Sequence, residues 1–413
     1  MTEPRIGAPI SRVDGIGKVT GEAKYAADHG VPGLAHGHVV SSQIARGKIL
    51  RIDVTAALAL PGVLRVFTHE NALRLVSPPR GESEEVAPGG SAFWPLRSAR
   101  VLYSGQPLAL VVAETPEQAR HAASLVQVEY MRHEHTTDLR GNLKSARKPR
   151  GGSAPSSRGR AERAWRGAAV PVEAEFWMPV EHHNPMELFA ATVVPDEDGR
   201  LTVYDKTQGV QNVQRYLCRA FKYSKGRLRV LSPFVGGAFG SGLRPQYHVF
   251  LAVLAARALK RPARVTLTRQ QMFTFGHRPA LWQRVALGAS ADGRLEAIIH
   301  EAVGETSRFE DFTEHVVDSS GLLYRCDNVR LAYKLAKARS LHAHGHAGTR
   351  SRLGRLCPRV RHGRARLPAG DGSPRAQDQK PCRAGPGREQ AIRQQGASRL
   401  LRAGGGAVRL AAS

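Results

Sequence analysis

The sequence is poor in cysteine and aromatic residues, and it contains no long apolar run. Its four cysteines, Cys218, Cys326, Cys357 and Cys382, form no C-x-x-C pair. We therefore expect neither a zinc site nor an iron–sulfur cluster held by this chain. No stretch approaches the ~18 apolar residues of a membrane span, and the first residues lack the apolar region of a signal peptide. We therefore expect neither a membrane span nor a signal peptide in this sequence.

Acidic residues are also scarce, and the resulting positive charge is unevenly distributed. The chain has 61 Lys and Arg against 35 Asp and Glu, a net charge of +26. Residues 339–413 carry half of that excess, with 15 arginines and one lysine against three acidic residues, and they contain no Phe, Trp or Tyr. Such a segment buries little, and it has no aromatic ring on which a base could stack. Charge alone would support binding of nucleic acid or acidic surfaces.

The remaining residues predict an α/β protein. A length of 413 residues with 41 % hydrophobic content is typical of two or three domains. Strand-like and helix-like runs alternate up to about Met131, and Thr115 with Pro116 predicts a helix start. A Gly/Ser/Pro/Arg-rich stretch follows, and then a second series of strands and helices. The predicted units are 1–139, a linker or long loop at 140–168, 169–338, and a low-complexity basic tail at 339–413.

The most distinctive local motif is FVGGAFGSGL at 234–243, between a predicted strand and a predicted helix. Glycines allow a ligand to approach bare backbone N–H groups, and the N-terminus of a following helix favours anions. A glycine-rich turn of this kind is also common as a plain tight connection, so spacing alone leaves both readings open. No Gly-Lys-Ser/Thr follows, which excludes a P-loop.

Two polar segments and one histidine cluster are further candidates. EHHNPME at 181–187 lies between predicted strands, and TQGVQ at 207–211 lies at a strand-to-helix turn. His182 and His183 are adjacent on an extended segment and point to opposite faces, so ordinary loop histidines are the favoured interpretation. His342, His344 and His346 have the spacing that places three imidazoles on one strand face, which suits zinc or nickel.

Taken together, five segments resemble one known family. In chain order they are GQPLALVVAE, EHHNPMEL, TQGVQNVQ, SPFVGGAFGSGLRPQ and LTRQQMFTFGHRP. The series is similar to the molybdenum-cofactor-binding large subunit of the xanthine dehydrogenase and aldehyde oxidase family, and closest to the bacterial aldehyde oxidoreductase branch. The resemblance runs from about Ile10 to Lys337. It implies an α/β hammerhead-like domain followed by the first half of a molybdopterin-binding domain.

The same resemblance implies roles for particular residues. In the family, a Thr-Gln turn supplies a glutamine that hydrogen-bonds an oxygen ligand of molybdenum, and a G-G-x-F-G loop brings backbone amides to the cofactor. The metal is held by the dithiolene of the cofactor, so no protein side chain is expected to ligate it. The residues that match as cofactor contacts are Gln208, Gly236, Gly237, Ala238, Phe239 and Gly240.

The resemblance further implies an oxidoreductase that hydroxylates aldehydes or N-heteroaromatics, with water as the oxygen source. Purine-oxidising members continue the loop with Lys-Glu, whereas this chain has Gly242 and Leu243, which favours aldehydes. Electrons would pass to an iron–sulfur small subunit and an FAD-binding subunit as partners, with no membrane partner. The bacterial branch suggests the cytosine dinucleotide form of the cofactor. We expect a cytoplasmic location, with export on a partner's signal left open.

The family pattern stops at Lys337, before its M-R-A-P-G segment and its catalytic glutamate. Codons for residues 338–350 can be chosen so that deleting one base gives LDLYTPMAMRAPG, and the same operation on 357–366 gives ALESAMDELA. We therefore hypothesise a frame slip after Lys337, which makes the chain as encoded inactive alone and the histidine cluster at 342–346 accidental. The competing hypothesis is a non-catalytic, degraded enzyme whose basic tail binds nucleic acid or acidic surfaces.

Overall fold

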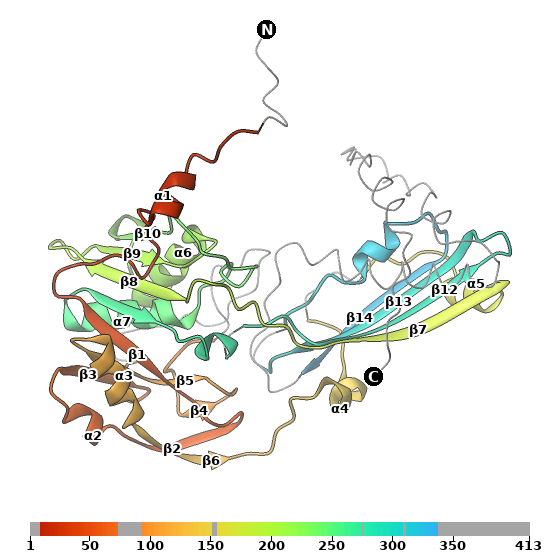
Figure 1. Ribbon diagram of the computed structural model, residues 1–413. Coiled ribbons are helices and arrows are strands. Elements are labelled where there is room, and N and C mark those ends of the chain that lie inside the picture. The colour runs from red at the N-terminus through yellow and green to blue at the C-terminus, as the bar shows by residue number, and fades with distance from the viewer. Residues whose placement is uncertain (1–8, 73–92, 151–154, 275, 309–310, 338–413) are drawn as a thin grey trace, which may run out of the picture.

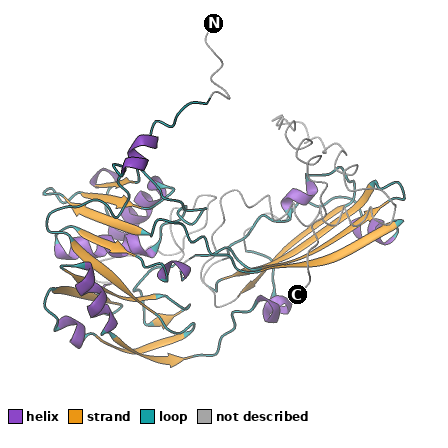
Figure 2. Ribbon diagram, viewed as in Figure 1, coloured by secondary structure: helices purple, strands orange, loops and turns teal. Residues whose placement is uncertain are grey.

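The computed structural model describes residues 9–72, 93–150, 155–274, 276–308 and 311–337 of the 413-residue chain. These residues form two lobes (Figure 1), one built on a seven-stranded and a three-stranded sheet and the other on a four-stranded sheet. Helices and strands are mixed in the first lobe, whereas strands dominate the second (Figure 2). The predicted α/β class is confirmed.

The seven-stranded sheet joins segments that are far apart in the chain. Its strand β1 pairs in parallel with β11, with Ala35 opposite Ala263, so strands at 35–41, 63–68 and 107–113 share one sheet with four strands between residues 190 and 266. All seven residues of β5 are buried, as its apolar run predicts. In sheet order the strands are β10 (Leu228–Leu231), β9 (Leu201–Asp205), β8 (Ala190–Pro195), β11 (Ala263–Thr266), β1 (Ala35–Ser41), β5 (Pro107–Ala113) and β3 (Val63–Thr68).

Helices cover this sheet, and their boundaries follow from local sequence. Helix α3 (Pro116–Ser124) begins after Thr115, which forms a capping box with Gln118, and this confirms the predicted N-cap. The first ten residues of α7 (Tyr247–Leu259) are buried in the main core. The other helices of this lobe are α1 (Gly15–Thr20), α2 (Thr55–Leu58) and α6 (Val210–Phe221), with 3-10 turns at Lys225–Arg227 and Gln271–Phe273.

The four-stranded sheet has the order β14-β13-β12-β7 and its own apolar core. The described residues of 140–168, predicted as a linker or long loop, contact this sheet: Arg147 and Arg158 form bridges to β14, and a short helix contacts β12 and β13. The elements are β7 (Val170–Met178), β12 (Leu281–Ala289), β13 (Leu295–Thr306), β14 (Val329–Lys337), α4 (Leu139–Asn142), α5 (Ala161–Arg166) and 3-10 turns at Leu143–Ser145 and Asp318–Gly321.

The third sheet is small and lies beside the first. It has the order β4-β2-β6 and contributes a separate apolar cluster around Ile49 and Val101. Its strands are β2 (Gly47–Asp53), β4 (Arg100–Val101) and β6 (Gln127–Arg132). Among the described residues, none of the helices has the length and apolar character needed to cross a bilayer.

Candidate functional site

Four sequence segments converge at one edge of the seven-stranded sheet. Strands β9 and β10 are parallel, with Tyr204 opposite Leu231, so both end at this edge. Strand β8 is antiparallel to β9 and β11, so its first residue, Ala190, lies beside the last residue of β11, Thr266. The segment before β8 and those after β9, β10 and β11 are therefore neighbours. We call residues 181–189, 206–209, 232–246 and 267–274 the site edge.

Gln208 and the glycine loop are joined directly by hydrogen bonds. The side-chain oxygen Oε1 of Gln208 accepts from the backbone N–H of Gly240 at 3.1 Å and of Gly242 at 3.2 Å. The backbone N–H of Gln208 donates to the carbonyl of Gly242 at 2.9 Å, and the Thr207 hydroxyl donates to the same carbonyl at 3.0 Å. The structure thus brings together the two motifs that the sequence places some thirty residues apart.

This arrangement leaves several hydrogen-bond donors unused. With Oε1 committed to the loop, the exposed Gln208 presents its Nε2 donor group, which bonds no described residue. The backbone N–H groups of Gly237, Ala238 and Phe239 likewise donate to none of the described residues. Positive φ values at Gly237 (88°), Phe239 (54°) and Gly240 (102°) give the loop its tight curvature. A positive φ is unusual for a phenylalanine, and Phe239 is 56 % exposed.

Glu187 stabilises the glycine loop by hydrogen bonds with Gly236. Its carboxylate Oε2 accepts from the Gly236 N–H at 2.6 Å, and its own N–H donates to the Gly236 carbonyl at 3.1 Å. A Cβ atom on Gly236 would lie 2.7 Å from the Glu187 Cβ, so only glycine fits this close approach. Burial raises the pKa of the Glu187 carboxyl, an effect that the Gly236 hydrogen bond opposes.

A buried lysine lies next to this glutamate. Lys206 is 1 % exposed, and its Nζ lies 3.5 Å from the centre of the Phe189 ring. Burial lowers the pKa of Lys206 to about 8, although the charges of Glu187 and Asp205 favour the protonated form. Asp205 itself bonds the buried His248, with Oδ1 2.9 Å from Nε2.

This charged cluster was missed by sequence reasoning. Strand alternation predicts that Asp205 and Lys206 face opposite sides, yet both side chains are buried. A lysine directly before Thr207 is the only sequence signal that could have marked it.

Arg269 fixes the segment that contains the paired histidines. Its guanidinium donates to the Asn184 side chain at 2.8 Å and to the carbonyls of Pro185 and Met186.

The described residues contain no group of three His, Cys, Asp or Glu side chains that could hold a metal ion. Burial lowers the pKa of His182, whose ring lies 6.0 Å from that of His277, and it lowers the pKa of His277 to about 3. The histidines at 342–346 lie outside the described residues.

The helix predicted after the glycine loop is present. It is α7, which begins at Tyr247, and residues 241–246 connect it to Gly240. These residues form turns held by Gln208 and by the Ser241 hydroxyl, which donates to the Ala238 carbonyl at 2.7 Å. The donors that the loop itself presents are its backbone amides.

Comparison with known proteins places this chain in a family. The model of the "aldehyde oxidase and xanthine dehydrogenase, a/b hammerhead domain" matches residues 20–134, and that of the "molybdopterin cofactor-binding domain" matches residues 146–342. The chain belongs to the aldehyde oxidase and xanthine dehydrogenase family. It therefore contains a hammerhead domain followed by a molybdopterin-binding domain, as the sequence motifs predict, and the site edge lies within the second match.

Individual relatives agree with this assignment. The aldehyde oxidoreductase molybdenum-binding subunit PaoC of Escherichia coli K12 is 34 % identical over 339 residues, which cover 80 % of this chain and 44 % of PaoC. The xanthine dehydrogenase molybdenum-binding subunit of Escherichia coli O157:H7 is 27 % identical, over 75 % of this chain and 42 % of that protein. The chain thus spans less than half the length of these relatives.

Solved structures show the same fold at lower identity. Quinoline 2-oxidoreductase from Pseudomonas putida 86 superposes with a TM-score of 0.76 at 22 % identity, over 88 % of this chain and 48 % of that one. The aldehyde oxidoreductase of Desulfovibrio gigas gives a TM-score of 0.73 at 21 % identity, over 88 % and 42 %. The two lobes of Figure 1 are therefore a known arrangement.

Proposed function

We propose that this chain binds a molybdenum–molybdopterin cofactor as part of an oxidoreductase that hydroxylates aldehydes or N-heteroaromatics, with water as the oxygen source. The proposal rests on the direct hydrogen bonds from Gly240 and Gly242 to Gln208, which join two motifs of the family at one edge of the sheet. The proposed contacts are Gln208 and the loop residues Gly236, Gly237, Ala238, Phe239 and Gly240.

The donor groups at the site edge suit such a cofactor. The Nε2 group of Gln208 can donate to an oxygen of the bound group, and three consecutive loop amides can donate to its other polar atoms. No cysteine or histidine cluster is required, because the cofactor carries its own sulfur ligands to the metal. When bound, the cofactor supplies the two-electron redox chemistry; the chain binds and orients it.

The loop favours an aldehyde over a purine. A Cβ atom on Gly242 would lie 3.2 Å from the backbone nitrogen of Gln208, so a lysine at this position would press on the turn that holds the proposed cofactor contact. The next residue, Leu243, is 44 % exposed and apolar. Neither Gly242 nor Leu243 offers a purine a carboxylate, whereas an aromatic aldehyde could pack against the leucine.

We further propose that electrons leave through an iron–sulfur small subunit and an FAD-binding subunit, and that the cofactor carries cytosine dinucleotide. Support for partner subunits comes from the two relatives described above, both of which are named as molybdenum-binding subunits. The two described cysteines, Cys218 and Cys326, form no disulfide, and neither belongs to a group of three possible metal ligands among the described residues, so they offer no cluster-binding set of their own.

The test measures metal content rather than turnover. The protein translated from the sequenced gene is produced with its two partner subunits in a host that makes the cofactor, and molybdenum per chain is determined by mass spectrometry. Gln208→Ala should lose most of the molybdenum, while Gln127→Ala, at an exposed glutamine of β6, should retain it. Equal molybdenum in the two variants, or none in the parent, would contradict the proposal.

The frame slip after Lys337 remains a hypothesis with its own test. Residues 338–413 lie outside the described part of the chain, so the structure neither supports nor opposes it, and the same is true of the basic tail as a nucleic-acid site. Sequencing the gene from about codon 330 past the stop would reveal a one-base slip that restores the M-R-A-P-G segment. An unshifted frame, with a 44.9 kDa product in the cell, would rule out the hypothesis.

A further inference from the structure

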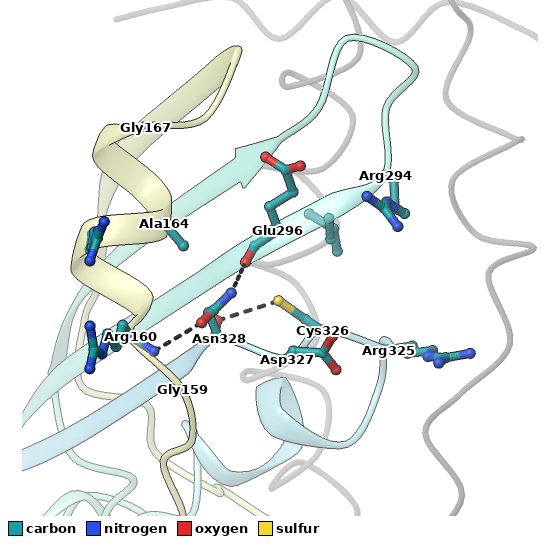
Figure 3. A pocket seen from close by; sticks show the side chains of 12 residues that line it. Gly159, Arg160, Ala164, Gly167, Arg294, Glu296, Arg325, Cys326, Asp327 and Asn328 are labelled. Carbon is teal, nitrogen blue, oxygen red and sulfur yellow. Dashed lines mark hydrogen bonds between the residues drawn. The ribbon is translucent and has the colours of Figure 1, made fainter.

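A second site lies in the other lobe, away from the site edge. A pocket of about 1010 Å³ opens at the end of the four-stranded sheet, between α5, the start of β13 and the turn before β14 (Figure 3). Its volume is at the upper end of the ~300–1,000 Å³ range of small-molecule sites, so it is larger than a single ion needs. The charged residues of its lining are Arg160, Arg163, Arg294, Arg325, Glu296 and Asp327.

The walls of the pocket are held in place by hydrogen bonds. The Asn328 side chain accepts from the Arg160 backbone N–H at 2.9 Å and donates to the Glu296 carbonyl at 2.9 Å, which joins three segments (Figure 3). The Arg158 guanidinium donates to the Cys326 carbonyl at 2.8 Å and to the Gly321 carbonyl at 3.1 Å. The pocket is therefore built by the fold and is not a gap between loose side chains.

Its four arginines differ from others in the same lobe in their pairing. Arg284 pairs with Glu173 at 2.5 Å and with Glu301 at 3.0 Å, and Arg330 pairs with Glu301 at 2.8 Å and also with Glu162. By contrast, none of the four pocket arginines forms an ion pair with a described residue. Helix α5 contains a charged residue of each kind: Glu162 forms an ion pair with Arg330 of β14, whereas Arg163 lines the pocket.

The guanidinium groups identify the chemistry of the ligand. Arginine presents a planar fork of donors that matches carboxylates and phosphates. The carboxylates of Glu296 and Asp327 also line the pocket and would repel a compact, multiply charged phosphate. A peptide segment spreads its charges, so its acidic side chains can reach the arginines while its apolar atoms contact Leu295 and Ala164. Residues 339–413 of this chain carry a net charge of +13 and do not provide such a segment.

We propose that this pocket, between α5 and the first residues of β13 and β14, binds an acidic segment of a partner protein through Arg160, Arg163, Arg294 and Arg325. The site is independent of the proposed cofactor contacts, which lie in the other lobe. It would serve as a docking point that fixes a partner to the four-stranded sheet.

The test follows individual arginines, because the basic tail would also bind an acidic probe. The full chain is modified with phenylglyoxal in the presence and absence of a hexaglutamate peptide, in buffer below about 0.1 M salt, where screening is weak. Peptide mass spectrometry gives the rate at each arginine. We expect hexaglutamate to slow modification of the four pocket arginines by roughly a factor of ten, the ratio for a largely occupied site. Arg229, exposed on β10, should be unaffected.

Two variants and a second probe decide the outcome. In an Arg163→Glu/Arg325→Glu double variant, Arg160 and Arg294 should lose their protection, whereas in Arg229→Glu they should keep it. Equal protection of Arg229, or protection that survives the double variant, would overturn the proposal. Stronger protection by inorganic tripolyphosphate than by hexaglutamate would also overturn it, because it would identify a phosphate site. The rate of arginine modification does not depend on molybdenum content, so failure of this proposal can be distinguished from failure of the proposed function.

Discussion

Charged residues are handled in opposite ways at the buried site edge of the first lobe and in an exposed ion pair of the second. At the site edge, Lys206 and Asp205 are almost fully buried, and each lies against a group that stabilises it. On the four-stranded sheet, by contrast, Arg330 and Glu162 are 46 % and 36 % exposed. A buried charge must be compensated inside the fold, whereas an exposed charge contributes little to stability and stays available for another molecule. The buried charges thus help to hold the site together, whereas the charges of this pair lie on the surface of the second lobe.

The largest effect should come from breaking the buried pair of Asp205 and His248. Their side chains are 2 % and 1 % exposed. Asp205→Ala leaves the imidazole without its partner, and we expect the free energy of unfolding to fall by about 3 kcal/mol. Urea denaturation of the full chain measures it. Asp205→Asn keeps an acceptor oxygen and should lower the free energy of unfolding clearly less. A loss below about 1 kcal/mol in the alanine variant would mean that the buried pair contributes little to stability.

The next prediction concerns the pH dependence of the free energy of unfolding that is due to Lys206. Its pKa in the folded chain is about 8, below the ordinary lysine value of 10.5. Between these values the unfolded chain binds the proton and the folded chain does not, so stability rises with pH across this window by about 3 kcal/mol. Lys206→Met should remove that rise in urea midpoints, whereas Lys48→Met, at an exposed lysine of β2, should retain it. An identical pH slope in both variants would count against a buried lysine.

A smaller effect is expected from filling the contact between Gly236 and Glu187. Gly236→Ala places a Cβ atom 2.7 Å from the Glu187 Cβ, and the backbone must shift to relieve it. We expect a loss of about 1–3 kcal/mol in stability. Gly226→Ala is the matched control, because a Cβ atom there meets nothing within 4 Å. If both variants unfold at the same urea concentration, the glycine loop is looser than its hydrogen bonds indicate.

The smallest effect should come from the exposed pair on the second lobe. Glu162→Gln removes one partner of Arg330, which keeps its bond to Glu301 at 2.8 Å. Because solvent screens this pair, the free energy of unfolding should change by less than about 0.5 kcal/mol. A change as large as that of Asp205→Ala would erase the contrast between the two lobes.

Local sequence patterns were sufficient to predict many elements. The runs VLRVFT and VPVEAEFWM are rich in the β-branched and aromatic residues typical of strands, and they form β3 and β7. The stretch predicted as a linker was harder, because helix α5 is only six residues long and has no apolar period of its own. It is stabilised by Ala161 and Trp165, which pack against Ala286 and Ile299 of β12 and β13. Contacts with residues more than a hundred positions away are invisible in a local pattern.

The sequence by itself determined the motifs, their order and the family, because a Thr-Gln turn and a glycine loop are written in consecutive letters. Tertiary structure alone decided that β1 joins β11, that Glu187 contacts Gly236 and that Lys206 is buried beside them. It also placed four arginines around one pocket, where none pairs with an acidic side chain of the described residues. These outcomes depend on which segments the sheets bring side by side and on which groups lose contact with water, and neither is encoded at any single position.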